Sequence, residues 1–339
     1  MGNNLNEILN HHPHRMTAVQ SAAQGRRAPL RQRRLTGLAG VALLVLAGCG
    51  GGGGSDTPAA APVAAAPVEV GAPTLTNNIP ADGLAWINYR RAQIGVQTVT
   101  RSTIIDRAAQ SHSDYQKTNN VVSHEEVAGK PGFTGADVGS RLKSAGYVFA
   151  TGGYAGEVIS ATSSSSGFFM AEELITAIYH RFAIFEPRFR EVGTGAATTT
   201  QKYTYFTTDF TTANGTGGLG RGAMVTWPAA NQTLVPVNFL SDNETPDPVA
   251  GVNEVGYPIS VHADIGSSIA VTSFTLRARG ANADLAVKLL RRLDDVHTPL
   301  SAAAIVPLAV LKAGATYDVT FKGSVDTVPV ERVWAFTTR

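Results

Sequence analysis

The spacing of apolar side chains separates a part of the chain with helical periodicity from a part with strand periodicity. Between residues 80 and 180, apolar residues recur every three or four positions, as they do on one face of an amphipathic helix. The clearest run extends from Ile105 to Tyr115. Helices are predicted to begin at Pro80, at Thr100 or Ser102 and at Asp137, and a fourth is predicted to carry His180 and Arg181 to its end before Pro187.

Strand signals follow in two groups. Residues 153–158 and 191–195 are predicted to enter strands, and residues 203–210 alternate aromatic and hydroxyl side chains as a half-buried strand does. Beyond a glycine-rich stretch at 211–222, short apolar runs with turn signals predict an all-β sandwich. Its strands are predicted at 235–240, 259–262, 269–277, 285–290, 317–321 and 332–337. Pro246-Asp247-Pro248 and the closing residues 334–338 resemble bacterial immunoglobulin-like modules.

The N-terminal 48 residues are predicted to be an export signal. They contain six arginines and one acid, and an apolar run of about twelve residues at 35–46, too short to span the ~30 Å hydrocarbon core of a bilayer. The run ends in Leu-Ala-Gly-Cys49, which resembles a bacterial lipobox, and Cys49 is the only cysteine of the chain. The resemblance implies a lipid anchor on Cys49 in the outer membrane; an ordinary signal peptide is the alternative. Translation is predicted to start at Met1 or Met16.

Composition adds a domain plan and excludes one class of partner. Residues 49–74 are rich in Gly, Pro and Ala and are predicted to form a disordered tether, since they lack large apolar side chains. The rest of the plan is a first domain at 75–212, a linker at 213–228 and a β-sandwich at 229–339. Without the leader, the chain holds 22 basic and 25 acidic residues, so no basic surface predicts nucleic-acid binding. The glycine-rich linker predicts that the two domains move independently.

The corner between the fourth helix and the next strand carries the most specific motif. Residues 179–195 read Tyr-His-Arg-Phe-Ala-Ile-Phe-Glu-Pro-Arg-Phe-Arg-Glu-Val-Gly-Thr-Gly. This segment resembles the core motif of the bacterial branch of the CAP superfamily (cysteine-rich secretory proteins, antigen-five, pathogenesis-related proteins). The asparagine and arginine pattern of residues 87–95, Ser123-His124 and Gly156-Glu157-Val158 resemble further family elements in the expected order. The resemblance implies an α+β fold, a three-layer α-β-α sandwich over residues 75–212, with a cleft.

The resemblance also implies candidate site residues. The family's cleft holds two histidines and two acids; His124, Glu157 and His180 match three of these positions, but Ala177 stands near the place of the second acid. Three such ligands with an open position suit a divalent metal such as zinc. The alternative is that the three side chains bond to one another and tie the loop, strand and helix together. A ligand groove is predicted beside Tyr154, Tyr179, Phe168 and Phe169.

Three functions remain open at this level. The leading one is an envelope-anchored lipoprotein whose CAP domain binds a lipid, cell-wall or protein ligand. The second is a metal-dependent hydrolase of peptide or cell-wall substrates, which the missing acid disfavours because it removes the natural general base. The third is a structural envelope protein with a vestigial cleft. The chain contains no Gly-x-Ser-x-Gly, and Cys49 is assigned to the lipobox, so no nucleophile for a hydrolase is evident.

Overall fold

The computed structural model describes residues 69–213 and 217–339, together with the backbone pairing of residues 16–17 and 21–22. The predicted signal peptide is otherwise outside the described residues, as are Cys49 and nearly all of the predicted tether. Two short strands, β1 (Met16–Thr17) and β2 (Ser21–Ala22), pair in parallel with β4. The helices of the described residues are α1 (Ile79–Gln93), α2 (Thr103–Asn119), α3 (Val138–Ser144), α4 (Gly167–Thr176), α5 (Ile178–Ile184) and the 3₁₀ turn η1 (Ser241–Asn243).

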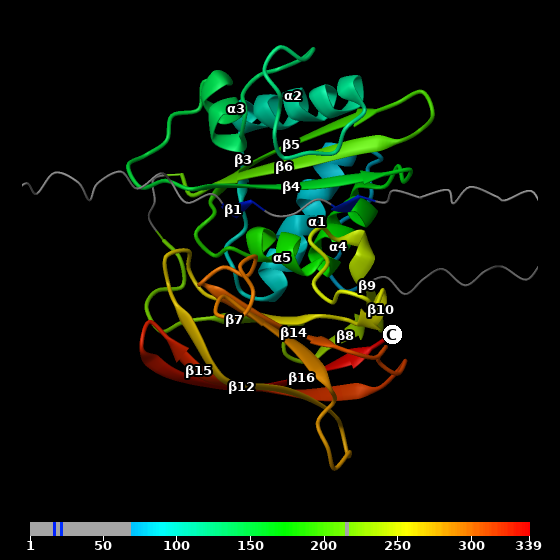
Figure 1. The fold of residues 1–339 in the computed structure, drawn as a ribbon, viewed down its shortest axis with the longest axis vertical. Coiled ribbons are helices and arrows are strands. Elements are labelled where there is room, and N and C mark those ends of the chain that lie inside the picture. The colour runs from blue at the N-terminus through cyan, green and yellow to red at the C-terminus, as the bar shows by residue number, and fades with distance from the viewer. Residues whose placement is uncertain (1–15, 18–20, 23–68, 214–216) are drawn as a thin grey trace, which may run out of the picture. The chain divides into compact units, whose positions relative to one another are not determined.

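The N-terminal domain has three layers, as predicted. Its sheet runs in the order β4 (Ala155–Thr162), β6 (Thr204–Thr211), β5 (Glu191–Thr198), β3 (Thr100–Arg101). The pairs β4–β6 and β6–β5 are antiparallel, and β3 pairs with β5 in parallel. Figure 1 shows α2 and α3 on one face of the sheet and α1, α4 and α5 on the other. The helix starts also follow the sequence: Asp137 caps α3 with a complete capping box, and Asn78 caps α1.

Two glycines of β5 set the distance between the sheet and α2. A Cβ atom on Gly193 would lie 2.1 Å from the backbone carbon of Ile105, and one on Gly195 would lie 2.3 Å from the backbone of Gln110. The helix therefore rests directly on the strand backbone. Polar side chains of α2 use this proximity, since Asp106 accepts a hydrogen bond from the Thr194 N–H at 2.9 Å. The Gly-Thr-Gly part of the motif is thus a packing requirement.

The C-terminal domain contains two four-stranded sheets, which confirms the all-β prediction. One sheet has the order β13-β14-β11-β7 and the other β12-β15-β16-β8, while β9 and β10 form a separate pair. The strands are β7 (Val225–Trp227), β8 (Gln232–Val235), β9 (Asn238–Leu240), β10 (Glu254–Gly256), β11 (Ile259–His262), β12 (Ile269–Ala278), β13 (Val287–Arg291), β14 (Ala302–Pro307), β15 (Thr316–Val325) and β16 (Val328–Thr338).

Three strands of this domain escaped the sequence prediction. β14 is buried along its whole length and therefore lacks the alternation that marks a half-buried strand. β7 and β10 have three residues each, too few for a periodic signal, and β7 lies within residues 213–228, the range predicted as a linker. The run predicted as one strand at 235–240 is two strands, β8 and β9.

Buried contacts join the two domains, in contrast to the independent motion expected from the glycine-rich stretch. One apolar cluster contains Phe185 of the first domain and Trp227 of the second, whose ring centroids lie 5.1 Å apart. Arg181, fully buried in α5, donates to the Pro258 carbonyl at 2.7 Å, and its guanidinium lies 4.9 Å from the Tyr257 ring centroid. Glu186 accepts a hydrogen bond from the Ile265 N–H at 2.8 Å. The expectation failed because it weighed only the connecting segment, and the domains meet through residues far from it.

Candidate functional site

His124 and Glu157 meet under the sheet, as the sequence predicts. His124 Nδ1 lies 2.8 Å from Glu157 Oε1, and the second carboxylate oxygen accepts a hydrogen bond from the Arg141 guanidinium. Arg141 also donates to the His124 carbonyl at 2.9 Å. Burial alone would raise the pKa of the Glu157 carboxyl, but the positive charges of Arg141, His112 and His124 hold that pKa well below its usual range. Glu157 is therefore a buried carboxylate with both oxygens already engaged.

Asp209 lies beside Glu157 and was not predicted from the sequence. The two residues are direct partners in the antiparallel pair β4–β6, and both are buried. Burial, followed by the negative charge of Glu157, raises the pKa of Asp209 well above its usual value. The shift has this direction because two adjacent buried carboxyls cannot both ionise cheaply. Only the register of β4 against β6 identifies this acid.

The alternative that His124, Glu157 and His180 bond to one another does not describe His180, which has a different partner. Its Nδ1 lies 2.9 Å from Glu244 Oε1, a residue of the second domain, and Glu157 is not among its hydrogen-bond partners. Burial lowers the pKa of His180, partly offset by the hydrogen bond to Glu244, so the ring is neutral near pH 7. His124 is near enough for its charge to lower that pKa further.

The local helix geometry explains how Glu244 reaches His180. The helix predicted to end after His180 and Arg181 is two helices, α4 and α5, separated at Ala177. His180 therefore lies in the first turn of α5 and not at the C-terminal end of a helix. Ala177 occupies the N-cap position and cannot cap with its side chain. The Glu244 carboxylate instead accepts from the N–H groups of Ile178 at 2.8 Å, Tyr179 at 2.7 Å and His180 at 3.2 Å. Glu244 of the second domain therefore provides the helix cap that Ala177 cannot provide.

The outer nitrogens of both histidines lack partners. His124 Nε2 and His180 Nε2 are buried and form no hydrogen bond within the described residues. A carboxylate that accepts from Nδ1–H leaves Nε2 as a free lone pair, the arrangement that metal-ligating histidines have. Glu157, the predicted third ligand, accepts hydrogen bonds from His124 and Arg141. Across residues 69–213 and 217–339, no group of three or more His, Cys, Asp or Glu side chains is arranged to hold a metal ion.

His112 forms part of the framework around this site. Its Nδ1 lies 2.9 Å from Glu126 Oε1 and its Nε2 lies 2.7 Å from the Ser123 carbonyl oxygen. Glu126 also accepts from the backbone N–H of Gly135 at 3.2 Å. Both side chains are buried. This network fixes the loop that carries His124 to helix α2.

The four aromatic residues predicted to line a groove do not gather in one place. Tyr179 is buried, belongs to a cluster with Phe182 and Phe239, and donates to Asp295 at 3.0 Å. Phe168 packs on Trp86, 4.9 Å between ring centroids, while the Phe169 side chain is about half exposed. Tyr154 precedes β4 and Phe168 follows it, so an eight-residue strand, roughly 26 Å long, separates them. The side chains of Tyr179 and Phe168 are thus packed against other residues of the protein.

The first domain is thus a three-layer α+β domain that carries two histidines and a buried acid, with a further acid, Glu244, contributed by the second domain. Residues 84–210 match the model of the cysteine-rich secretory protein family, CAP. This part of the chain is a CAP domain, as its motifs indicated.

Two solved bacterial structures are similar to the chain. An extracellular protein containing an SCP domain from Bacillus anthracis is 23% identical over 40% of this chain and 40% of that protein, with a TM-score of 0.34. An outer surface protein of Borrelia burgdorferi is 12% identical over 38% of this chain and 87% of that protein, with a TM-score of 0.32. The chain thus spans about two fifths of the Bacillus protein's length. A comparison with curated proteins found no significant match.

Proposed function

We propose that the protein is an exported, envelope-anchored binding protein whose CAP domain takes a ligand at the His124–His180 pair. The observation that carries the proposal is that the Nε2 atoms of His124 and His180 are both buried and have no hydrogen-bond partner among residues 69–213 and 217–339. Buried polar atoms in folded proteins are normally hydrogen-bonded, so two unpaired nitrogens in one region favour a missing partner. A purely structural cluster would be expected to satisfy both rings, and it satisfies only their Nδ1 atoms.

The hydrolase alternative has less support. A general base near pH 7 needs a free carboxylate or imidazole with a pKa close to neutrality. Glu157 has both oxygens engaged and a lowered pKa, while the Nδ1 of His180 is committed to Glu244. A divalent cation such as zinc would find two imidazole nitrogens here, and its remaining ligands would come from the bound molecule or solvent.

Export and anchoring belong to the same proposal. The arginine-rich leader, the apolar run and the lipobox with Cys49 support an outer-membrane lipoprotein held by a lipid on that cysteine. Helices long and apolar enough for a bilayer are absent from the part of the chain that the structure describes. Ligand classes that fit an envelope location are lipids, cell-wall fragments and other proteins.

A zinc titration of the full chain tests the site. Wild type, His124→Gln, His180→Gln and the matched control His297→Gln would be titrated by calorimetry, with unfolding curves for each variant. We expect saturable binding near one zinc per chain that both cleft substitutions weaken by at least about tenfold and the control leaves unchanged. Absence of binding in the wild type, or equal binding in all four proteins, would refute a ligand site at the histidine pair.

The same proteins separate the remaining alternatives. Zinc-dependent cleavage of casein or of purified cell wall, lost in both cleft variants, would support the hydrolase. Cleft variants that lose stability and bind zinc like the wild type would support the structural alternative.

A further inference from the structure

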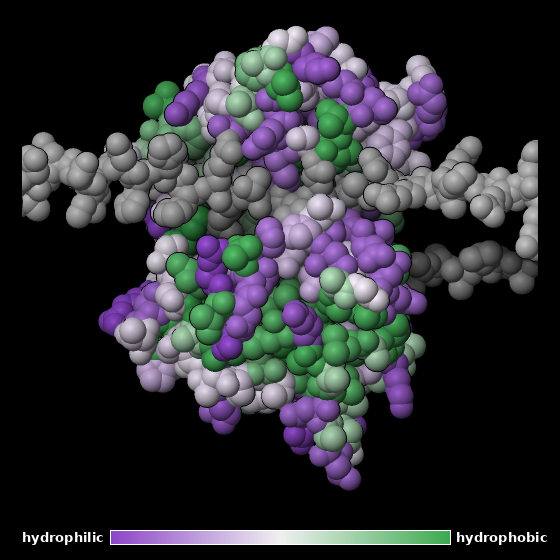
Figure 2. Space-filling view, viewed as in Figure 1, coloured by the Kyte–Doolittle hydropathy of each residue, from purple (hydrophilic) through white to green (hydrophobic). Residues whose placement is uncertain are grey.

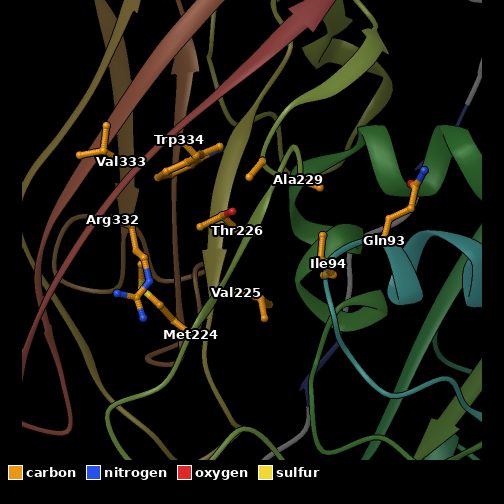
Figure 3. Close-up of a pocket in the computed structure, with 10 residues that line it drawn as sticks. Gln93, Ile94, Met224, Val225, Thr226, Ala229, Arg332, Val333 and Trp334 are labelled. Atoms are coloured by element: carbon orange, nitrogen blue, oxygen red, sulfur yellow. The ribbon is translucent and has the colours of Figure 1, made fainter.

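A cavity of about 380 Å³ lies where the CAP domain meets the β-rich domain. Its lining includes Ile94 at the end of α1, Met224 and Thr226 at β7, and Arg332 and Trp334 on β16. Figure 3 shows the α1 end on one side of the cavity and β16 on the other, with β7 between them. This volume is in the range of small-molecule sites, which are commonly found between domains.

The cavity exists because two sheets end beside it. β7 is the last strand of its sheet, and β16 is paired with β8 only at Phe336 and Thr338. The part of β16 that carries Arg332 and Trp334 therefore has a strand neighbour, β15, on one side only. Neither β7 nor this part of β16 is therefore covered by another strand on the side of the cavity.

The lining combines an apolar wall with one uncompensated positive charge. Ile94, Met224 and Trp334 supply apolar and aromatic surface. Arg332 donates to the carbonyl of Glu331 at 3.1 Å and forms no ion pair within the described residues. The nearest carboxylate in sequence, Glu331, is already paired with Lys322 at 2.9 Å. None of the residues that line the cavity is acidic.

A buried donor without a partner lies in the same wall. The indole Nε1 of Trp334 is buried and has no acceptor within the described residues. Indole N–H groups in protein interiors usually find an acceptor. Within the described residues, the buried indole donor has no acceptor, and the exposed Arg332 guanidinium nearby has no carboxylate partner. A ligand that carries oxygen acceptors and negative charge could bind both groups.

We propose that this cavity binds a small monoanion with an apolar body, such as an aromatic or short aliphatic carboxylate. The carboxylate pairs with Arg332, and the apolar body packs against Trp334, Met224 and Ile94. The site is independent of the histidine pair. Because both domains line it, the ligand also stabilises the junction between them by mass action.

Ligand-detected NMR titration of the full chain tests the proposal. The probes are sodium phenylacetate and sodium hexanoate, each compared with its neutral amide. The variants are Arg332→Gln, which removes the charge; Ala230→Trp, which fills the cavity from its exposed rim; and Arg277→Gln, a control that removes an exposed charge from β12 of the same sheet, outside the cavity. Near-ultraviolet circular dichroism checks that each variant is folded.

We expect at least one carboxylate to bind with a dissociation constant of about 1 mM or lower, as suits a ligand of roughly ten heavy atoms. Its amide should bind about fivefold more weakly, the effect of one partly exposed ion pair. Arg332→Gln should remove that difference, Ala230→Trp should abolish binding, and Arg277→Gln should change nothing. Carboxylates that bind no better than amides would overturn the proposal, as would binding that survives in folded Ala230→Trp.

Discussion

Glu244 belongs to the second domain, but it should contribute strongly to the stability of the CAP domain. Its carboxylate accepts hydrogen bonds from three successive backbone N–H groups at the start of α5 and from the His180 ring. Both Glu244 and His180 are buried, so water cannot replace the lost bonds in a variant. Replacement of Glu244 therefore tests whether the second domain completes the first.

The expected cost follows from these contacts. Glu244→Ala leaves three N–H groups and a ring nitrogen without partners, and the loss of one member of a buried hydrogen-bonded pair costs about 3–5 kcal/mol. Glu244→Gln keeps the shape of the side chain but removes a negative charge at a helix N-terminus, an interaction that stabilises by up to about 2 kcal/mol. It also places an amide NH₂, which cannot accept a hydrogen bond, next to backbone N–H donors. We expect free energies of unfolding lowered by about 4 kcal/mol for alanine and about 2 kcal/mol for glutamine.

Urea unfolding followed by far-ultraviolet circular dichroism measures both values. Glu254→Gln is the matched control, since Glu254 is exposed on β10 and accepts a hydrogen bond from the side chain of Asn238. Such a surface change should alter the free energy of unfolding by no more than about 0.5 kcal/mol. Equal stabilities of Glu244→Gln and Glu254→Gln would refute the role assigned to Glu244.

Three further predictions concern the buried framework. Burial raises the pKa of Glu186 from 4.5 to about 7, so its contribution to stability is complete below pH 4.5 and is lost as the pH rises through 7. Unfolding curves of the wild type at pH 5 and pH 8 should show this decline in stability. Glu186→Gln should remove up to about 3 kcal/mol of the decline. Gly195→Ala should lower the free energy of unfolding by about 3 kcal/mol, because the new Cβ would lie 2.3 Å from the Gln110 backbone. The control Gly139→Ala, in α3, should not lower it. Equal melting temperatures of the two variants would contradict this. Arg181→Lys should lower the free energy of unfolding by about 2–3 kcal/mol, because an ammonium cannot reach the three carbonyls that the guanidinium bonds, and an unchanged urea midpoint would exclude the assigned role.

Local chemistry explains why much of the CAP domain could be predicted. Asp137 and Ser140 form their capping box within four residues, and the helical spacing from Ile105 to Tyr115 follows from one buried face. The family resemblance alone predicted that His124 and Glu157 belong to one site. In the structure His124 Nδ1 lies 2.8 Å from Glu157 Oε1. Such features depend on neighbours in the chain or on a pattern that many sequences share.

The residues that complete the site could not be predicted in this way. Glu244 lies 64 residues beyond His180 in a turn with no regular pattern, and only docking of the second domain brings it to α5. Asp209 becomes a partner of Glu157 only through strand register. The burial of β14 on both faces likewise removed the alternation by which a strand is recognised.

The sequence by itself determined the helices and most of the strands, the CAP identity of residues 84–210 and the nature of two site residues, because these follow from side-chain periodicity, caps and short motifs. Tertiary structure alone decided which acid holds His180, which atoms of the two histidines stay unpaired, and where a cavity opens between the domains. These properties depend on groups far apart in the chain, and their energies arise only when burial removes water and leaves each polar atom with the partners that packing provides.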